Sequence, residues 1–147
     1  MRVKQLESRD GRRTFAIVFS TGEEVGRGLF AFAHEHGVGG AYFTAIGALR
    51  EVTLGYWDWE TKDYCRIPLR EQVEVLSLAG NVALNPDGSP KVHAHVVVGK
   101  ADGTAHGGHL LEGHVRPTLE VILVESPQHL RRTYDATTGL ALIDVRA

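Results

Sequence analysis

The sequence predicts an α+β fold in which one principal helix packs on a mainly antiparallel β-sheet. Three observations predict it: most apolar segments are short and rich in strand-forming residues, polar turns separate them, and clear helical spacing occurs in a single stretch. Short turns between consecutive strands favour antiparallel pairing. The length of 147 residues suits one hydrophobic core, so we expect residues 1–147 to form a single domain.

The chain is expected to begin with a β-hairpin. Residues 13–19 are rich in β-branched and aromatic side chains, which is typical of a strand. An Asp10-Gly11 turn would pair this strand with residues 3–7.

The predicted helix follows this hairpin. Its apolar residues recur at helical spacing and are Val25, Leu29, Phe32 and Ala33. We expect Ser20 or Thr21 to cap the helix, with Glu23 and Glu24 in its first turn. Gly37 is expected to end it, because glycine readily adopts the left-handed conformation found after helices.

The rest of the chain is expected to form strands separated by polar turns. The expected strands are residues 41–48, 51–57, 64–69, 73–84, 92–98, 105–115, 118–125 and, as a final edge strand, 141–145. Gly80 lies inside the strand at 73–84, where glycine often marks a bulge or a close approach of the backbone.

Histidines provide the main functional signal. His93 and His95 are two residues apart in an expected strand, so both rings lie on one face. An antiparallel return after the turn at 101–104 would bring either His106 or His109 across this pair. We select His109, because two glycines precede it and permit a close backbone approach.

Three neutral imidazoles are a suitable ligand set for a divalent metal such as zinc. Three protein nitrogens leave one coordination position open for water or a small anionic ligand. Thr44, Glu112 and Glu120 are candidates for supporting or basic groups around such an ion. The alternative interpretation is that two histidines on one face are ordinary hydrogen-bonded groups.

Other histidines are expected to have structural roles. His34 and His36 lie at the expected helix end, where positive charge is favoured, and they do not share a helix face. His114 is expected to point away from the face of His109.

The overall charge gives no support for a DNA-binding surface. Sixteen Lys and Arg residues against eighteen Asp and Glu give a net charge of -2, without a basic surplus for phosphate contacts. The pairs Arg12-Arg13 and Arg131-Arg132 lie near acidic residues, so we expect both to be solvated surface.

The single cysteine and the two tryptophans are interpreted as packing residues. Cys65 has no partner for a disulfide and is expected to be a small buried hydrophobe. Trp57 and Trp59 are expected in the core or at a subunit contact. The chain shows no signal-peptide pattern and no apolar run of membrane-spanning length, so we expect a cytoplasmic protein without membrane contact.

Several motifs together resemble the PPC domain, which occurs alone in prokaryotes and beside AT-hook DNA-binding motifs in land plants. The matching segments are residues 43–49, 76–82, 93–95, 107–115 and 118–121. The resemblance implies a homotrimeric α+β fold with zinc held by His93, His95 and His109 near a subunit boundary. It also implies a DNA-binding label, although the chain lacks the Arg-Gly-Arg-Pro core of an AT-hook.

These observations lead to three functional hypotheses. The first is a homotrimeric metal-binding module with a binding or regulatory role, whose subunit contacts use residues 76–84 and 119–124. The alternative is a metal-dependent enzyme that acts on a small metabolite through the open three-histidine site. The third is DNA binding by the trimer, in which Arg50, Arg66 and Arg116 from three copies converge.

Overall fold

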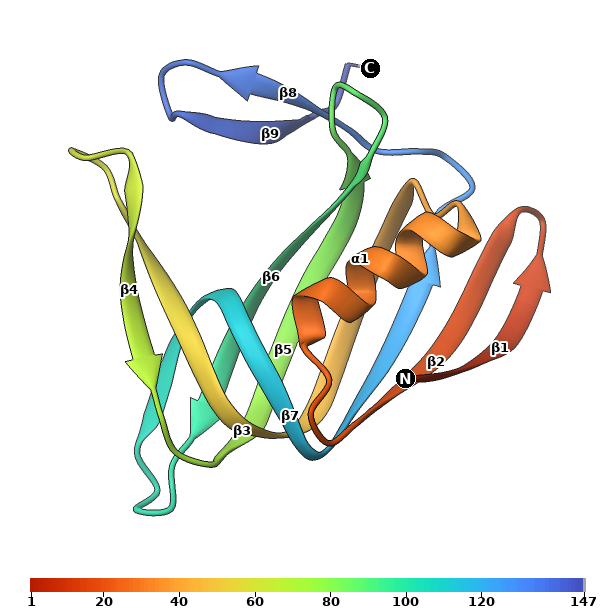
Figure 1. Cartoon of the computed structure of the whole chain (residues 1–147). Helices are drawn as coiled ribbons and strands as arrows, with labels where there is room; N and C mark the ends of the chain where they lie inside the picture. The colour runs from red at the N-terminus through yellow and green to blue at the C-terminus, as the bar shows by residue number, and fades with distance from the viewer. Residues whose placement is uncertain (147) are drawn as a thin grey trace.

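A computed structural model describes residues 1–146, which form one nine-stranded sheet and one helix (Figure 1). The elements are β1 (Arg2–Arg9), β2 (Arg12–Ser20), α1 (Val25–His36), β3 (Gly40–Asp58), β4 (Asp63–Leu69), β5 (Val73–Leu84), β6 (Pro90–Gly99), β7 (Ala105–Glu125), β8 (Arg131–Asp135) and β9 (Leu140–Asp144). The main path of the sheet is β1-β2-β7-β3-β5-β8-β9. β4 pairs with β3, and β6 pairs with both β5 and β7. The predicted α+β class is confirmed, and the pairing is antiparallel except for one parallel contact between β5 and β8.

The N-terminal hairpin is confirmed. β1 and β2 pair antiparallel across the turn, where Asp10 has a φ of 51° and Gly11 a φ of 77°. Two consecutive positive φ angles give the turn a twist that matches the twist of a two-stranded ribbon. β2 then pairs with the second half of β7 and brings the hairpin into the main sheet.

The helix lies where the sequence predicts it, but its cap is different. Glu24 caps α1, because its carboxylate accepts hydrogen bonds from the backbone N–H groups of Gly26 and Arg27 at 3.0 and 2.6 Å. The predicted cap at Ser20 or Thr21 is therefore wrong, since β2 extends to Ser20 and a turn precedes the helix. Gly37 ends the helix in the left-handed conformation, with a φ of 64°.

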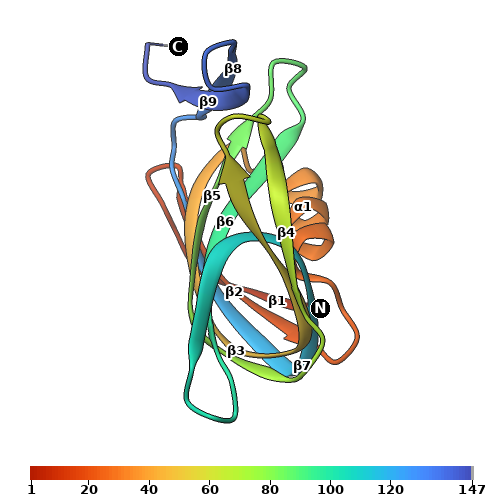
Figure 2. The same ribbon diagram turned by 90° about the vertical axis from the view of Figure 1, so that its left-hand side faces the viewer.

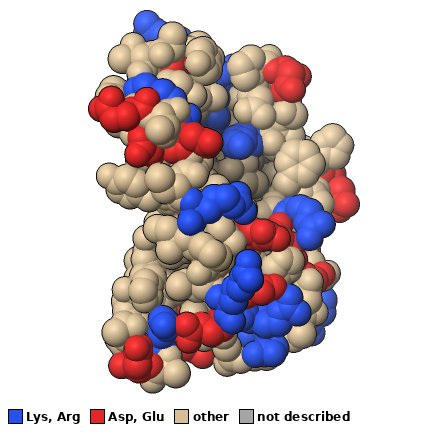
Figure 3. Space-filling view, turned by 60° about the vertical axis from the view of Figure 1, so that its left-hand side comes forward, with Lys and Arg blue, Asp and Glu red and all other residues tan. Residues whose placement is uncertain are grey.

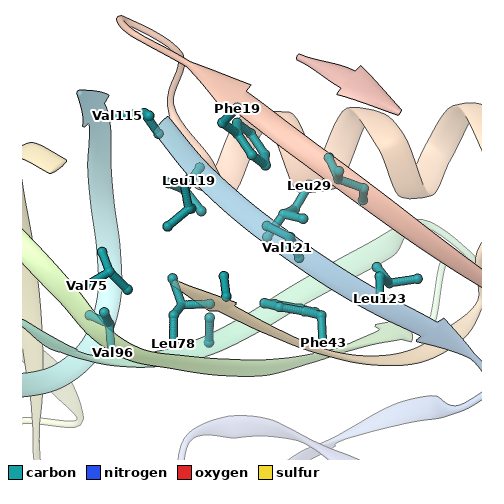
Figure 4. Packing of buried hydrophobic residues seen from close by; sticks show 14 of the residues in the cluster. Phe19, Leu29, Phe43, Val75, Leu78, Val96, Val115, Leu119, Val121 and Leu123 are labelled. Atoms are coloured by element: carbon teal, nitrogen blue, oxygen red, sulfur yellow. The ribbon is translucent and has the colours of Figure 1, made fainter. Parts of the chain in front are cut away.

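The hydrophobic core lies between α1 and one face of the sheet. Leu29 of the helix and Phe19, Phe43, Leu119 and Leu123 of the strands are fully buried and belong to one cluster (Figure 4). The opposite face of the sheet has no helix over it among the described residues (Figure 1).

The strands β3 and β7 are longer than predicted. Each was expected as two strands, but each continues through its expected break and bends (Figure 2). Their mutual pairing has register shifts between Gly47 and Leu49 and between Leu49 and Glu51. These irregularities let the ladder bend without ending, because a bulge changes the strand direction locally.

Two further predictions concern β4 and β5. Gly80 of β5 confirms the predicted close approach, because a Cβ atom there would lie 2.4 Å from the carbonyl oxygen of His93. On β4, the side chain of Cys65 is exposed, so the prediction that it is a small buried hydrophobe is wrong. Among residues 1–146, β4 pairs with β3 alone, so β4 is an edge strand with one side open to solvent.

The C-terminal hairpin was only half predicted. β9 was expected, whereas β8 was not, and the two strands pair antiparallel at one end of the sheet (Figures 1 and 2). In the part of the chain that the structure describes, no helix is both long and apolar enough to cross a membrane.

Candidate metal centre

The three predicted histidines lie together on the sheet face that α1 leaves open. One ligand atom from each of His93, His95 and His109 lies within 4.8 Å of the others. The ring centroids are 5.2 Å apart for His93 and His95, 5.1 Å for His93 and His109, and 5.3 Å for His95 and His109. This spacing lets small ring rotations direct all three nitrogens at one ion.

Strand register creates this convergence. His93 and His95 lie on β6, and His109 of β7 pairs directly opposite His95. His106, the alternative considered from the sequence, pairs with Val98 instead and lies outside the cluster.

Two glycines make room beside His109. A Cβ atom at Gly108 would lie 2.8 Å from the carbonyl oxygen of Gly55, so only glycine lets β7 approach β3 this closely. A Cβ atom at Gly55 would lie 2.8 Å from the ring of Tyr64. Tyr64 stacks on His109 with a centroid distance of 4.7 Å, so the glycines position both the ligand and its neighbouring ring.

Burial and neighbouring charges favour the neutral form of His93 and His109. Burial, followed by the charges of His93 and His95, lowers the pKa of His109 from 6.5 to about 4. Burial also lowers the pKa of His93, with smaller effects from the charges of Arg132 and His95. A neutral imidazole has a free lone pair, which is the form that binds a metal.

The cluster also contains an unsatisfied polar atom. The Nδ1 atom of His109 is buried and has no hydrogen-bond partner among the described residues. A buried nitrogen of this kind normally finds a partner, because its desolvation costs free energy. A metal ion is a chemically suitable partner, so the residues fit a divalent cation.

The supporting groups expected from the sequence are not at the cluster. Glu112 contacts His114 instead, with an Oε1–Nε2 distance of 3.0 Å. Thr44 and Glu120 line a hollow on the open sheet face with Ile46 and Ile122. His36 lies at the helix end as expected, with its Nδ1 atom 3.1 Å from the carbonyl oxygen of Phe32.

Sequence reasoning missed three groups near the histidines. Tyr64 stacks on His109, and Trp57 packs edge-on against Tyr64 at 4.9 Å between centroids. Arg132 is 7% exposed, so its predicted solvation is wrong. Elsewhere in the fold, Arg13 is half-buried and forms an ion pair with the buried Glu125. The pairing of Trp57 with Tyr64 across β3 and β4 could have been predicted from the hairpin pattern, whereas nothing in the sequence placed Arg132.

Comparison with solved structures finds proteins of the same fold. A metal-containing protein from Archaeoglobus fulgidus is 38% identical, with 88% of this chain and 91% of that chain covered and a TM-score of 0.81. A plant- and prokaryote-conserved protein from Pyrococcus horikoshii is 35% identical, with 97% and 94% covered and a TM-score of 0.84. A proposed DNA-binding protein from Bacteroides thetaiotaomicron is 28% identical, with 99% of each chain covered and a TM-score of 0.86.

Curated relatives include the bifunctional protein GlmU of two Synechococcus strains. The protein of strain JA-3-3Ab is 33% identical over 130 residues, which cover 86% of this chain and 20% of the relative. That of strain JA-2-3B'a(2-13) is 37% identical over 102 residues, which cover 68% of this chain and 15% of the relative. The chain thus spans a fifth or less of the length of these relatives.

A protein-family model confirms the resemblance to the PPC domain that the sequence motifs indicate. The model of the Plants and Prokaryotes Conserved (PCC) domain matches residues 6–127. This range contains β2 to β7 and all three clustered histidines. The chain therefore belongs to the Plants and Prokaryotes Conserved domain family, for which the abbreviation PPC is also used.

Proposed function

We propose that the chain is a metal-binding module that holds a divalent cation, zinc, on His93, His95 and His109. The observation that carries this proposal is the convergence of three histidine side chains, together with a buried ring nitrogen of His109 that has no hydrogen-bond partner among the described residues. Zinc is the favoured ion because it accepts neutral imidazoles in a four-coordinate arrangement. Three nitrogens leave a fourth position for water or a small anion.

The module is proposed to act as a homotrimer. Large apolar side chains are exposed on the sheet face opposite α1: Tyr42, Ile46, Leu76, Val97 and Ile122. Exposed apolar surface of this kind marks an interaction site. His95 lies on the same face and pairs with Ala79, which in turn pairs with Thr44, so a subunit contact on this face would lie near the metal.

The curated relatives support a binding or regulatory role. In the Synechococcus GlmU proteins the matched segment is a small part of a much longer chain. A unit that occurs inside a longer protein can supply binding or assembly to its host. We extend only this modular use to the present chain, and not the activities of GlmU.

DNA binding is the function suggested by the name of the Bacteroides relative, and the charges of this chain favour it less than metal binding. Arg50 contacts Glu51, and Arg66 lies 4.0 Å from Glu112. On the face shown in Figure 3, several Lys and Arg side chains gather in the lower part of the view, with Asp and Glu between and beside them. A protein that binds DNA through its phosphates usually presents a surplus of positive charge on the binding surface.

A second candidate is catalysis by the same metal. A cleft of about 440 Å³ on the α1 side of the sheet includes His109 in its lining, with Phe30, Lys91 and Leu111. An open zinc position can activate water or polarise a carbonyl group. Turnover of activated ester or lactone substrates by the zinc-loaded protein, lost in His95→Ala, would support this alternative.

Metal content tests the primary proposal directly. The untagged protein should bind zinc with one ion per histidine cluster, measured by elemental analysis and calorimetry. His95→Ala and His109→Ala should each weaken zinc binding by more than about 100-fold, because loss of a direct ligand exceeds the effect of losing a supporting group. His106→Ala is the matched control on β7 and should retain wild-type affinity. Equal zinc binding by all four proteins would overturn the proposal.

A further inference from the structure

Arg132 is a charged residue in an unusual position. It lies on β8, outside the range that the family model matches, and its side chain is almost completely buried. Burial lowers the pKa of its guanidinium, which means that the surroundings disfavour the charge. Among residues 1–146, no carboxylate forms an ion pair with it.

The guanidinium is only partly hydrogen-bonded. Its Nη1 atom donates to the carbonyl oxygen of Ala141 at 2.9 Å, and its Nη2 atom donates to Oδ1 of Asn81 at 2.7 Å. The Nε atom is buried and has no partner among the described residues. A guanidinium has five N–H donors, so these two bonds leave donors available for a ligand.

The bond to Asn81 places the guanidinium beside the histidine cluster. Asn81 of β5 pairs directly with His93 of β6. Side chains of directly paired residues lie on the same face of a sheet, with Cβ atoms about 4.5–5.5 Å apart. Arg132 is therefore one hydrogen bond away from Asn81, the directly paired neighbour of a proposed metal ligand.

A role limited to holding the C-terminal hairpin accounts for only part of this arrangement. The bonds to Ala141 and Asn81 link β9 and β5, which is a structural function. Those bonds leave the positive charge uncompensated and the Nε atom unsatisfied, and both carry a free-energy cost in a buried site. A small anion at the cluster would compensate the charge.

We propose that Arg132 and the metal together bind a small carboxylate ligand, with one carboxylate oxygen on the open metal position and the other accepting from the guanidinium. This inference rests on the proposed metal site. A carboxylate fits because its two oxygens can bond two neighbouring partners at once, and arginine matches its planar geometry. Inorganic phosphate has the same ability to bridge a metal and an arginine, so the experiment includes both anions.

The test uses the cobalt-loaded full-length protein, because the visible spectrum of Co²⁺ changes when an anion enters its coordination sphere. Acetate and inorganic phosphate are titrated separately into the wild type, Arg132→Met and Arg131→Met. Arg131 is the matched control, since it is the adjacent arginine on β8 and is exposed. Arg132→Met should weaken acetate binding by about tenfold or more with unchanged cobalt stoichiometry, as expected for loss of a charge-assisted hydrogen bond.

Each outcome has a distinct meaning. Absence of cobalt binding by the wild type would overturn the metal site and this inference together. Cobalt binding with equal acetate affinity in the wild type and Arg132→Met would overturn this inference alone. Tighter binding of phosphate than of acetate would overturn the assignment to carboxylates. If Arg132→Met does not fold, Arg132→Lys keeps the charge without the planar fork and should show the same loss for acetate.

Discussion

At the scale of single residues, the cluster shows how burial prepares a group for binding. His109 stacks on Tyr64 and faces two other imidazoles, so protonation would place a charge in a poorly solvated position beside other potential charges. The same surroundings leave its Nδ1 atom without a partner. In the metal-free protein the ring of His109 therefore stays neutral. In acid this lowers the stability of the folded state, because the unfolded chain binds the proton more readily.

The pKa of about 4 for His109 gives a pH prediction. The folded value lies below the ordinary value near 6.5, so the unfolded chain takes up the proton first as the pH falls. The free energy of unfolding of metal-free protein should thus decrease between pH 6.5 and about 4, with no further loss from this group at lower pH. NMR titration of the ring and denaturant unfolding at several pH values measure both quantities.

The matched control for this prediction is His109→Gln, which removes the titrating ring. Its unfolding free energy should depend less steeply on pH over the same interval. A ring of His109 that titrates at pH 6 or above in the metal-free wild type would contradict the prediction.

At the scale of secondary-structure elements, close contacts at glycines hold the strands in register. Gly80 is the clearest case, because a Cβ atom there would also lie 2.4 Å from the ring of Phe43. The same position contacts the backbone of His93, so packing of β5 on β6 and placement of a proposed ligand are connected.

Gly80→Ala should therefore reduce both stability and metal affinity. Overpacking of this kind costs about 1–3 kcal/mol, and a displaced His93 can no longer match the other two histidines. Thermal or urea unfolding measures the first effect, and zinc calorimetry the second. Ser77→Ala, at an exposed position of the same strand, should leave both unchanged. Wild-type zinc affinity in a destabilised Gly80→Ala protein would contradict the proposed connection.

The start of α1 gives a second prediction at this scale. Glu24 caps the helix, and its carboxylate also accepts from the backbone N–H of Gly113 on β7 at 3.2 Å. Glu24→Ala should lower the free energy of unfolding by about 1–2 kcal/mol, because three backbone N–H groups lose their acceptor. Glu35→Ala, an exposed change on the same helix, is the control and should have little effect. If the two variants have equal free energies of unfolding in urea, the Glu24 cap does not contribute to stability and the prediction is wrong.

At the scale of the whole molecule, the two faces of the sheet are unequal. One face packs on α1 around Leu29 and Phe43, whereas the other exposes Tyr42, Ile46 and Ile122. The cluster lies on this second face, so association there would change the surroundings of the metal. Assembly and binding are therefore expected to influence each other.

The homotrimer predicts a mass three times that of the 16.1 kDa chain in light scattering coupled to gel filtration. Ile46→Asp, which places a charge in the exposed apolar face, should shift the protein to a monomer. Leu6→Asp is the control, because Leu6 is similarly exposed but lies on the edge strand β1. A monomeric wild type at micromolar concentration would overturn the proposed assembly.

The sequence by itself determined the class of fold through local periodicity, and the histidine cluster through periodicity together with the two glycines before His109. The spacing of Val25, Leu29 and Phe32 requires a helix, and alternation along a strand places His93 and His95 on one face. A short hairpin connection then returns His109 opposite His95. The predicted breaks in β3 and β7 were wrong because bulges bend a strand without ending it, which local composition does not reveal.

Only the tertiary structure decided what surrounds the cluster. Arg132 reaches Asn81 across 51 residues of sequence, through a single parallel contact between β5 and β8. The adjacent Arg131 is exposed and gives the same local signal, so charge patterning cannot distinguish the two. The physical reason is that periodicity fixes which face of its own strand a side chain occupies, whereas its partners depend on how distant strands pack together.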